Sequence, residues 1–193
     1  MKLRIAILLG ALFCACRPGW SPAQPAQPAS LVPSRDERAV LAAVVAFLGE
    51  DQPFLVVADS TFGPELDEYV RAALREDTAL DARLIDQIVR DFTVRNVAST
   101  TLPPDLSPAV PVRTYHWSEI ESNPGGRAEM LARFAPQTWF HRLSRPGFDA
   151  RRTTAIVWRA FWCPGLCGYT GMVILRRSRS GWRVVDTVGL SIS

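Results

Sequence analysis

Three titratable side chains are the candidates for acid–base chemistry in this sequence. His116 stands between a tyrosine and a tryptophan, Asp59 follows a wholly apolar run, and Asp91 lies late in a stretch with helical spacing. Asp59 and Asp91 could point into one pocket, where a carboxylate or an imidazole can act as a general acid or base. Each has a structural alternative: His116 as a packed or edge residue, Asp59 as a turn cap, and Asp91 as a solvated side chain or the partner of Arg95 one helical turn later.

The sequence gives little support for a catalytic nucleophile or a metal site. The sequence has no G-x-S-x-G elbow, no glycine-rich phosphate loop and no cluster of metal-ligating residues. Ser144 follows His141 by three positions, which places the two side chains on opposite faces of a strand. We therefore expect no catalytic set of this kind, no metal and no cofactor.

A cysteine pair lies between two apolar, β-branched runs. Cys163 and Cys167 flank a Pro-Gly-Leu loop, and a three-residue loop with glycine is a common hairpin connection. Such a turn places the two cysteines opposite each other, at a separation that a disulfide can bridge. Free thiols and a metal site are the alternatives, although zinc usually needs four ligands and the two histidines lie in unrelated contexts. We predict a disulfide.

Five of the six tryptophans fall in the β-rich second half of the chain. Trp158 and Trp162 lie four positions apart on a predicted strand and so share one face. Most of these tryptophans are expected in the core, but Trp158 and Trp162 could line a groove or a partner surface. With Asp59, Asp91 and His116, they complete the set of candidate ligand-binding residues.

The N-terminal residues predict export. Lys2 and Arg4 precede an apolar run too short to span a bilayer, so residues 1–15 have the pattern of a signal peptide. The sequence Phe-Cys-Ala-Cys that ends at Cys16 resembles a bacterial lipobox, with a phenylalanine in place of the usual leucine. We predict acylation of Cys16; ordinary cleavage, which releases a soluble secreted or periplasmic protein, is the alternative. Both place the mature chain outside the cytoplasm, where disulfides persist.

Residues 16–33 are rich in proline, alanine, glutamine and serine, as in an extended tether, and residues 34–193 are long enough for a single domain. Removing Lys2 and Arg4 takes the formal charge from +3 to +1. We therefore expect no nucleic-acid partner, and contact with a membrane only through a lipid anchor. Arg176, Arg177 and Arg179 do cluster, but at a predicted hairpin end, where charges usually keep a turn in water.

Periodicity predicts helices first and strands later. A capping box from Ser34 to Glu37 opens a helix that glycine 49 ends. The further expected elements are helices over residues 66–74 and 84–92, two short helical pieces within 118–134, and strands over 53–58, 112–117, 138–145, 153–162, 169–177 and 182–192. Residues 97–111 form a long proline-rich loop that we expect to carry recognition.

The last predicted strand has a clear period-two pattern. Its apolar residues are expected on one face: Trp182, Val184, Val188, Leu190 and Ile192.

Several short motifs together resemble a family of uncharacterised bacterial secreted proteins and lipoproteins. They are Leu143-Ser-Arg-Pro-Gly-Phe148, Thr154-Ala-Ile-Val, Cys163-Pro-Gly-Leu-Cys-Gly168 and Gly181-Trp-Arg-Val-Val185. The order of elements is similar to that of NTF2-like and cystatin-like folds. The resemblance implies an α+β fold in which N-terminal helices pack on a curved antiparallel sheet. The last three predicted strands, joined by the Cys163–Cys167 turn and by a Ser180-Gly181 turn, predict that this sheet ends in a three-stranded meander. The family has no assigned activity, so no catalytic residue follows from it.

The sequence therefore predicts an extracytoplasmic, non-catalytic binding or structural domain of the bacterial cell envelope, whose partner is an unknown envelope protein or small ligand. The alternative is a small enzyme with an NTF2-like pocket that uses Asp59, Asp91 or His116 as its base. A deep pocket that holds two of these groups would favour the enzyme, and a filled sheet face would favour the binding or structural domain.

Overall fold

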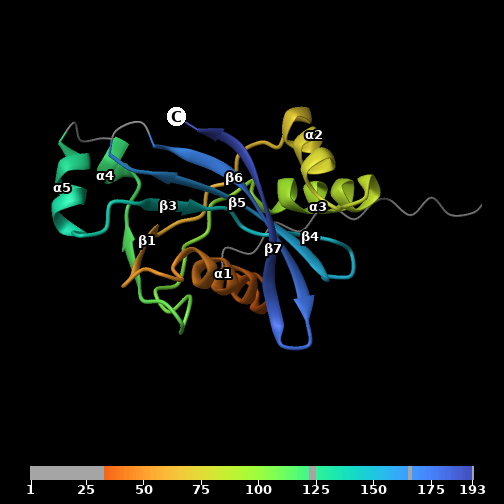
Figure 1. Ribbon diagram of the computed structural model, residues 1–193, viewed down its shortest axis with the longest axis horizontal. Helices are drawn as coiled ribbons and strands as arrows, with labels where there is room; N and C mark the ends of the chain where they lie inside the picture. The colour runs from red at the N-terminus through yellow and green to blue at the C-terminus, as the bar shows by residue number, and fades with distance from the viewer. Residues whose placement is uncertain (1–32, 122–124, 165–166, 193) are drawn as a thin grey trace, which may run out of the picture.

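The computed structural model describes residues 33–121, 125–164 and 167–192. The predicted signal peptide, the lipidation site Cys16 and all of the tether except Pro33 lie outside the described residues. The elements, in chain order, are α1 (Arg35–Leu48), β1 (Leu55–Ala58), α2 (Glu68–Asp77), α3 (Ala82–Arg95), β2 (Val112–Tyr115), α4 (Ser118–Glu121), α5 (Gly126–Arg133), β3 (Phe140–Leu143), β4 (Gly147–Phe148), β5 (Thr154–Trp162), β6 (Tyr169–Ser178) and β7 (Gly181–Ile192) (Figure 1). The described helices are all too short or too polar to cross a bilayer.

The strands form one seven-stranded sheet in the order β2-β1-β3-β5-β6-β7, with β4 paired to β5. The α+β class and the closing meander of β5, β6 and β7 are confirmed. The expectation of a wholly antiparallel sheet is wrong at one end, because β1 runs parallel to both β2 and β3. Parallel neighbours need a long crossover, and the segments that contain α2 with α3 and α4 with α5 provide it.

The sheet is covered on both faces. Along β5, Ala155 and Val157 point toward α1, whereas Ile156 and Trp158 point toward α2 and α3. The second face continues over β1 and β3, where α4 and α5 cover a third cluster centred on Phe140. Helix α1 therefore lies on one face, whereas α2 with α3 and α4 with α5 lie on the other, at opposite ends of the sheet (Figure 1).

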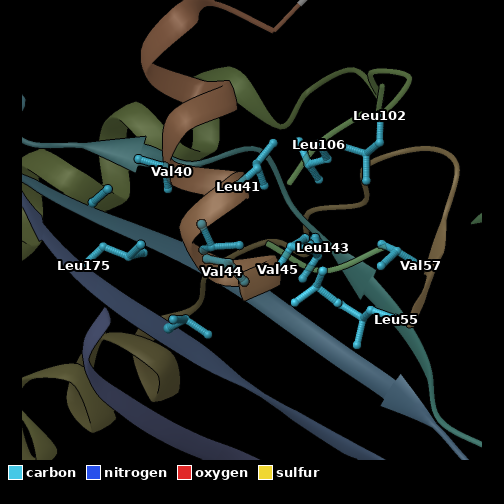
Figure 2. Close-up of a cluster of buried hydrophobic side chains, with 14 of the residues drawn as sticks. Val40, Leu41, Val44, Val45, Leu55, Val57, Leu102, Leu106, Leu143 and Leu175 are labelled. Carbon is cyan, nitrogen blue, oxygen red and sulfur yellow. The ribbon is translucent and has the colours of Figure 1, made fainter. Parts of the chain in front are cut away.

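Helix α1 is built as its sequence predicts. Ser34 accepts a hydrogen bond from the Glu37 amide, and the Glu37 carboxylate accepts one from the Ser34 amide, which completes the capping box. The apolar stripe of the helix packs on Leu55, Leu143 and Leu175 of the sheet (Figure 2). The stripe consists of Val40, Leu41, Val44 and Val45.

A buried ion pair joins this helix to the connection between β3 and β4. Arg145 donates from Nε and Nη2 to Glu37 Oε1 at 2.9 and 2.8 Å, and the two side chains are only 3% and 2% exposed. Arg95 Nη1 lies 3.5 Å from the same oxygen. Burial disfavours the charged form of Glu37, but hydrogen bonds from Ser34 and Arg145 outweigh it and hold the pKa of this carboxyl below its ordinary value.

The expected single apolar face of β7 is wrong. The register shifts between Ile174 and Leu175 of β6, where Ile174 pairs with Asp186 and Leu175 pairs with Val184. The extra residue reverses the alternation of side chains, which a β-bulge does by inserting one residue into one strand. As a result, Trp182 and Val184 pack on the α1 side, whereas Val188 and Leu190 pack on the α2–α3 side. The side chain of Ile192 lies outside what the structure describes.

The loop over residues 97–111 lacks helix and strand elements, as predicted, but it is packed against the fold. Leu102, Leu106 and Val110 are buried in the cluster under α1. The loop is also tied to the end of β1, because the Leu102 amide donates to the Asp59 carbonyl at 2.7 Å. These contacts make the loop part of the core, which weakens the expectation that it carries recognition.

Candidate functional site

Asp59 and His116 meet at the carboxyl ends of two parallel strands. Asp59 follows β1 and His116 follows β2, so the parallel pairing brings both residues to the same edge of the sheet. His116 Nδ1 lies 2.9 Å from Asp59 Oδ2. Two further bonds fix the pair: the Asp59 amide donates to the Tyr115 carbonyl at 2.9 Å, and the His116 amide donates to Glu119 Oε1 at 3.0 Å.

The pair lies at the surface. The His116 side chain is 61% exposed and that of Asp59 is 35% exposed. Asp59 Oδ1 is nevertheless buried and has no hydrogen-bond partner among the described residues, which is uncommon for a carboxylate oxygen. When His116 Nδ1 carries the proton and donates a hydrogen bond to Asp59, the Nε2 atom of the same ring is unprotonated. Nε2 can then accept a proton from a bound group.

Tyr115, beside this pair, has a structural role. Its hydroxyl donates to the His141 carbonyl at 3.3 Å, and its ring lies in the α4–α5 cluster. Burial raises the pKa of the Tyr115 phenol, because the charged form would lose its hydration. It therefore stays protonated and cannot serve as a base.

Asp91 lies elsewhere, and the expectation that it shares a pocket with Asp59 is wrong. Its carboxylate accepts from Arg95 Nε at 2.6 Å and from the Phe148 amide at 2.9 Å. The first bond is the i,i+4 pair that its ordinary interpretation predicts. The second attaches β4 to α3, so Asp91 holds the sheet and the helix together.

Trp158 and Trp162 share the face opposite α1, as predicted, and line a groove between the two helical pairs. The groove has a volume of about 280 Å³. It is lined by Trp117, Phe140, Arg142, Trp158, Ala160, Phe161, Trp162, Gly168, Tyr169 and Thr170. Trp158 is only 7% exposed and belongs to the α2–α3 core, whereas Trp162 is half-buried and packs on Phe140 with the rings tilted by 34° and their centroids 5.1 Å apart.

Arg142 connects this groove with the Asp59–His116 pair. Its guanidinium lies 4.0 Å from the Phe62 ring centroid and 3.9 Å from the Trp117 ring centroid. Trp117 directly follows His116, and Phe62 packs edge-to-face on Trp158 with centroids 5.5 Å apart. Arg142, Trp117 and Phe62 therefore connect the Asp59–His116 pair with the residues that line the groove.

Arg142, Phe140 and Trp117 were not singled out by sequence. Their register could not be read from the chain: Arg142 lies opposite Ala160 and Phe140 lies opposite Trp162 in the β3–β5 ladder. The available signal was the i,i+2 spacing of Phe140 and Arg142 on one predicted strand, which places both on a single face.

Ser144 and His141, which lie three positions apart in the sequence, are both buried. Ser144 is buried, and its hydroxyl donates to the Arg145 carbonyl while accepting from the Trp158 amide. Burial, and secondarily the charge of Arg159, lowers the pKa of His141 to about 3, so this imidazole is neutral. Among the described residues, no group of three or more histidine, cysteine or acidic side chains is placed to hold a metal ion.

The predicted disulfide is present. Cys163 and Cys167 are bonded, with their Cα atoms 5.8 Å apart, at the turn that connects β5 to β6. The turn directly follows Trp162, so the bond restrains one end of the groove. A disulfide fits a protein outside the cytoplasm, where thiols are oxidised.

No protein-family model, no curated protein and no solved structure matches this chain. The resemblance to uncharacterised secreted proteins and to NTF2-like or cystatin-like layouts therefore stays a prediction.

Proposed function

We propose that this chain is an extracytoplasmic binding domain of the bacterial cell envelope, held at the membrane by a lipid on Cys16. Its ligand is a small molecule, or a side chain of an envelope protein, with a bulky apolar or aromatic group. That group enters the aromatic groove between the two helical pairs. The disulfide supports the compartment, and the lipobox-like sequence supports the anchor.

The groove is the observation that carries the proposal. On the second face of the sheet, α2 and α3 cover one end and α4 and α5 cover the other, and between them aromatic side chains line an open hollow. Aromatic walls with a few polar groups are typical of ligand sites in proteins. The cationic Arg142 lies in the wall, so a ligand that combines an apolar body with a polar or anionic end would match it.

The surroundings of His116 favour binding over catalysis. Its exposed ring lies outside the residues that line the groove, so a bound group would not be shielded from water there. No serine, threonine or cysteine hydroxyl or thiol bonds to this ring among the described residues. A deep pocket that holds two titratable groups would indicate an enzyme. Among the described residues, Asp59 and His116 instead form a pair at the surface.

A ligand search tests the proposal. The mature protein is extracted from its native envelope, and copurified small molecules and cross-linked peptides are identified by mass spectrometry. Replacing Ala160 by Leu fills the groove floor, and Trp162→Ala removes one wall. Both changes should abolish recovery of the ligand. Tyr69→Ala is the control, because Tyr69 is an exposed aromatic residue that does not line the groove. Equal recovery from all variants would refute the proposed site.

The Asp59–His116 hydrogen bond supports a second candidate, an acid–base enzyme that acts at this pair. Asp59→Asn keeps the shape of the side chain but removes its charge, and His116→Ala removes the base. If either change abolished a phenotype of the gene while Ala160→Leu left it intact, catalysis at the pair would replace binding in the groove.

Lipidation at Cys16 has its own test. Mass spectrometry of the mature N-terminus should find an acylated cysteine at position 16. An unmodified N-terminus downstream of Cys16 would rule out the anchor and leave the groove proposal standing.

A further inference from the structure

Five arginines gather at one end of the molecule, and they come from three separate segments. We name this surface the arginine end. Figure 1 shows two of its segments, the β4 end of the sheet and the tip of the β6–β7 hairpin, on the side away from α4 and α5. The members are Arg35 at the start of α1, Arg151 and Arg152 in the turn after β4, and Arg177 and Arg179 at the β6–β7 tip.

Specific contacts hold the three segments together. Asp36 accepts ion pairs from Arg152 at 3.2 Å and from Arg177 at 3.6 Å. The Arg177 amide also donates to the Thr153 carbonyl at 2.8 Å, which joins the two turns directly. The start of α1 is therefore fixed beside both arginine-bearing turns.

Positive charge exceeds negative charge at this end. One carboxylate, Asp36, faces two arginines, and a second, Asp149, is turned inward onto the Thr153 and Thr154 amides at 2.6 and 2.7 Å. Arg151 and Arg179 are exposed and form no ion pair within the described part of the chain. Two further arginines, Arg176 and Arg183, lie just behind the tip, next to Asp186 and the acidic α2–α3 connection. The chain without Lys2 and Arg4 carries a formal charge of only +1, so this end holds an unusual share of the positive charge.

The type of cation also matters. Lys2 is the single lysine of the sequence, so every positive side chain of the domain is an arginine. The planar guanidinium can donate two parallel hydrogen bonds to a phosphate, which an ammonium cannot do.

The tether enters the domain at the same place. Seventeen residues separate Cys16 from Ser34, the N-cap of α1, and Asp36 of that first turn is the residue that pairs with the arginine turns. A chain anchored at Cys16 therefore leads directly to the arginine end. One acyl signal combined with a basic patch anchors far more firmly than either does alone.

We propose that the arginine end binds the anionic headgroups of the phospholipid membrane, and so sets the orientation of the domain with its aromatic groove pointing away. The inference rests on the proposed lipid anchor for its geometry, but its test does not use the lipid. Each arginine that reaches a negatively charged bilayer surface contributes about 1 kcal/mol, or about fivefold in partitioning.

The test uses the mature chain from residue 16 with Cys16→Ser, which cannot be acylated. Partitioning is measured by cosedimentation with vesicles of phosphatidylcholine alone and with about 30% phosphatidylglycerol added. In about 50 mM salt the anionic vesicles should bind at least roughly tenfold more protein, and about 0.5 M salt should remove the difference by screening.

Charge-matched variants locate the surface. Arg151→Gln with Arg179→Gln should reduce binding to anionic vesicles by about fivefold for each arginine. Arg113→Gln with Arg127→Gln removes the same charge from the other end of the sheet and should change binding by less than about twofold. Circular dichroism checks that each variant is folded, and Arg35→Gln replaces Arg151→Gln or Arg179→Gln if that variant is not.

Three results would overturn the proposal. They are equal binding to neutral and anionic vesicles, equal losses from the two variant pairs, and salt-sensitive binding of short duplex DNA without binding of vesicles. Because the protein tested has no acyl group, failure here leaves the anchor and the groove to their own tests.

Discussion

Removing the charge of Glu37 is the perturbation with the clearest expected cost. Glu37→Gln leaves an oxygen that can still accept from the Ser34 amide, so the capping box survives. The charge is lost, however, and Arg145 is left buried without its counter-ion, because its two bonds to a carboxylate both end on Glu37 Oε1 and its third goes to the neutral Arg95 carbonyl.

The magnitude follows from burial. Breaking a buried, hydrogen-bonded ion pair by removing one partner costs about 3–5 kcal/mol, since the remaining charge stays out of water. The geometry places Glu37 in that class, because its side chain and that of Arg145 are almost fully covered. With a urea m-value of about 2 kcal/mol per M for a domain of this size, the unfolding midpoint should fall by roughly 2 M.

Urea unfolding followed by tryptophan fluorescence measures the change. Glu68→Gln is the matched control, because it breaks an ion pair with Arg75 that is largely exposed and should leave the midpoint nearly unchanged. The double variant Glu37→Gln with Arg145→Met should cost less than the sum of the two single changes, because it leaves no unpaired buried charge. Equal shifts for Glu37→Gln and Glu68→Gln would refute the reasoning.

The pH dependence gives an independent check. Because the folded-state pKa of Glu37 is lowered, its stabilising contribution is present above the ordinary pKa of a glutamate, near 4.5. That contribution is lost as the pH falls through the folded-state pKa. The difference between wild type and Glu37→Gln should therefore shrink in acid. A difference that stays constant down to low pH would show that the charge is not the cause.

Three further predictions concern the core and the turn. Burial lowers the pKa of His141 to about 3, so as the pH falls below about 6.5 this histidine is protonated in the unfolded chain but not in the folded one. The free energy of unfolding should therefore drop by up to about 1.4 kcal/mol per pH unit. In urea titrations at several pH values, His141→Gln should flatten that slope. Gly147→Ala would place a Cβ 2.5 Å from a side chain of α3 and should lower the free energy of unfolding by about 1–3 kcal/mol, whereas Gly189→Ala, whose Cβ would be 3.6 Å from its neighbours, should be close to neutral by the same assay. Thiol titration of the unfolded chain without reductant should find neither Cys163 nor Cys167 free, and replacing both by serine should cost at most about 2 kcal/mol.

Local patterns determined much of the fold. The capping box from Ser34 to Glu37, the apolar stripe of α1 and the meander of β5, β6 and β7 all follow from short-range spacing, and all are present. The Cys163–Cys167 bond belongs to the same class, because a three-residue loop fixes the separation of its ends. Interactions within a few residues need no knowledge of distant partners, so the chain alone specifies them.

Two local inferences failed where a distant partner intervened. The alternation of β7 predicted one apolar face, but the bulge against β6 reverses it between Val184 and Val188. Asp91 was expected to face a pocket with Asp59, yet its carboxylate accepts a hydrogen bond from the Phe148 amide, which joins α3 to β4. Register and pairing depend on which strands meet, and that choice is made by the whole core.

The candidate site depends almost entirely on such long-range pairing. His116 and Asp59 are 57 positions apart, and only the parallel pairing of β1 with β2 places them 2.9 Å from each other. The groove needs Phe140 and Arg142 opposite Trp162 and Ala160, a register that no composition or period encodes. The sequence supplied the residue types, the aromatic face and the oxidised turn. Long-range packing decided which of these side chains share a surface, because distant segments come into contact only when the helices pack on the sheet and form the three hydrophobic clusters.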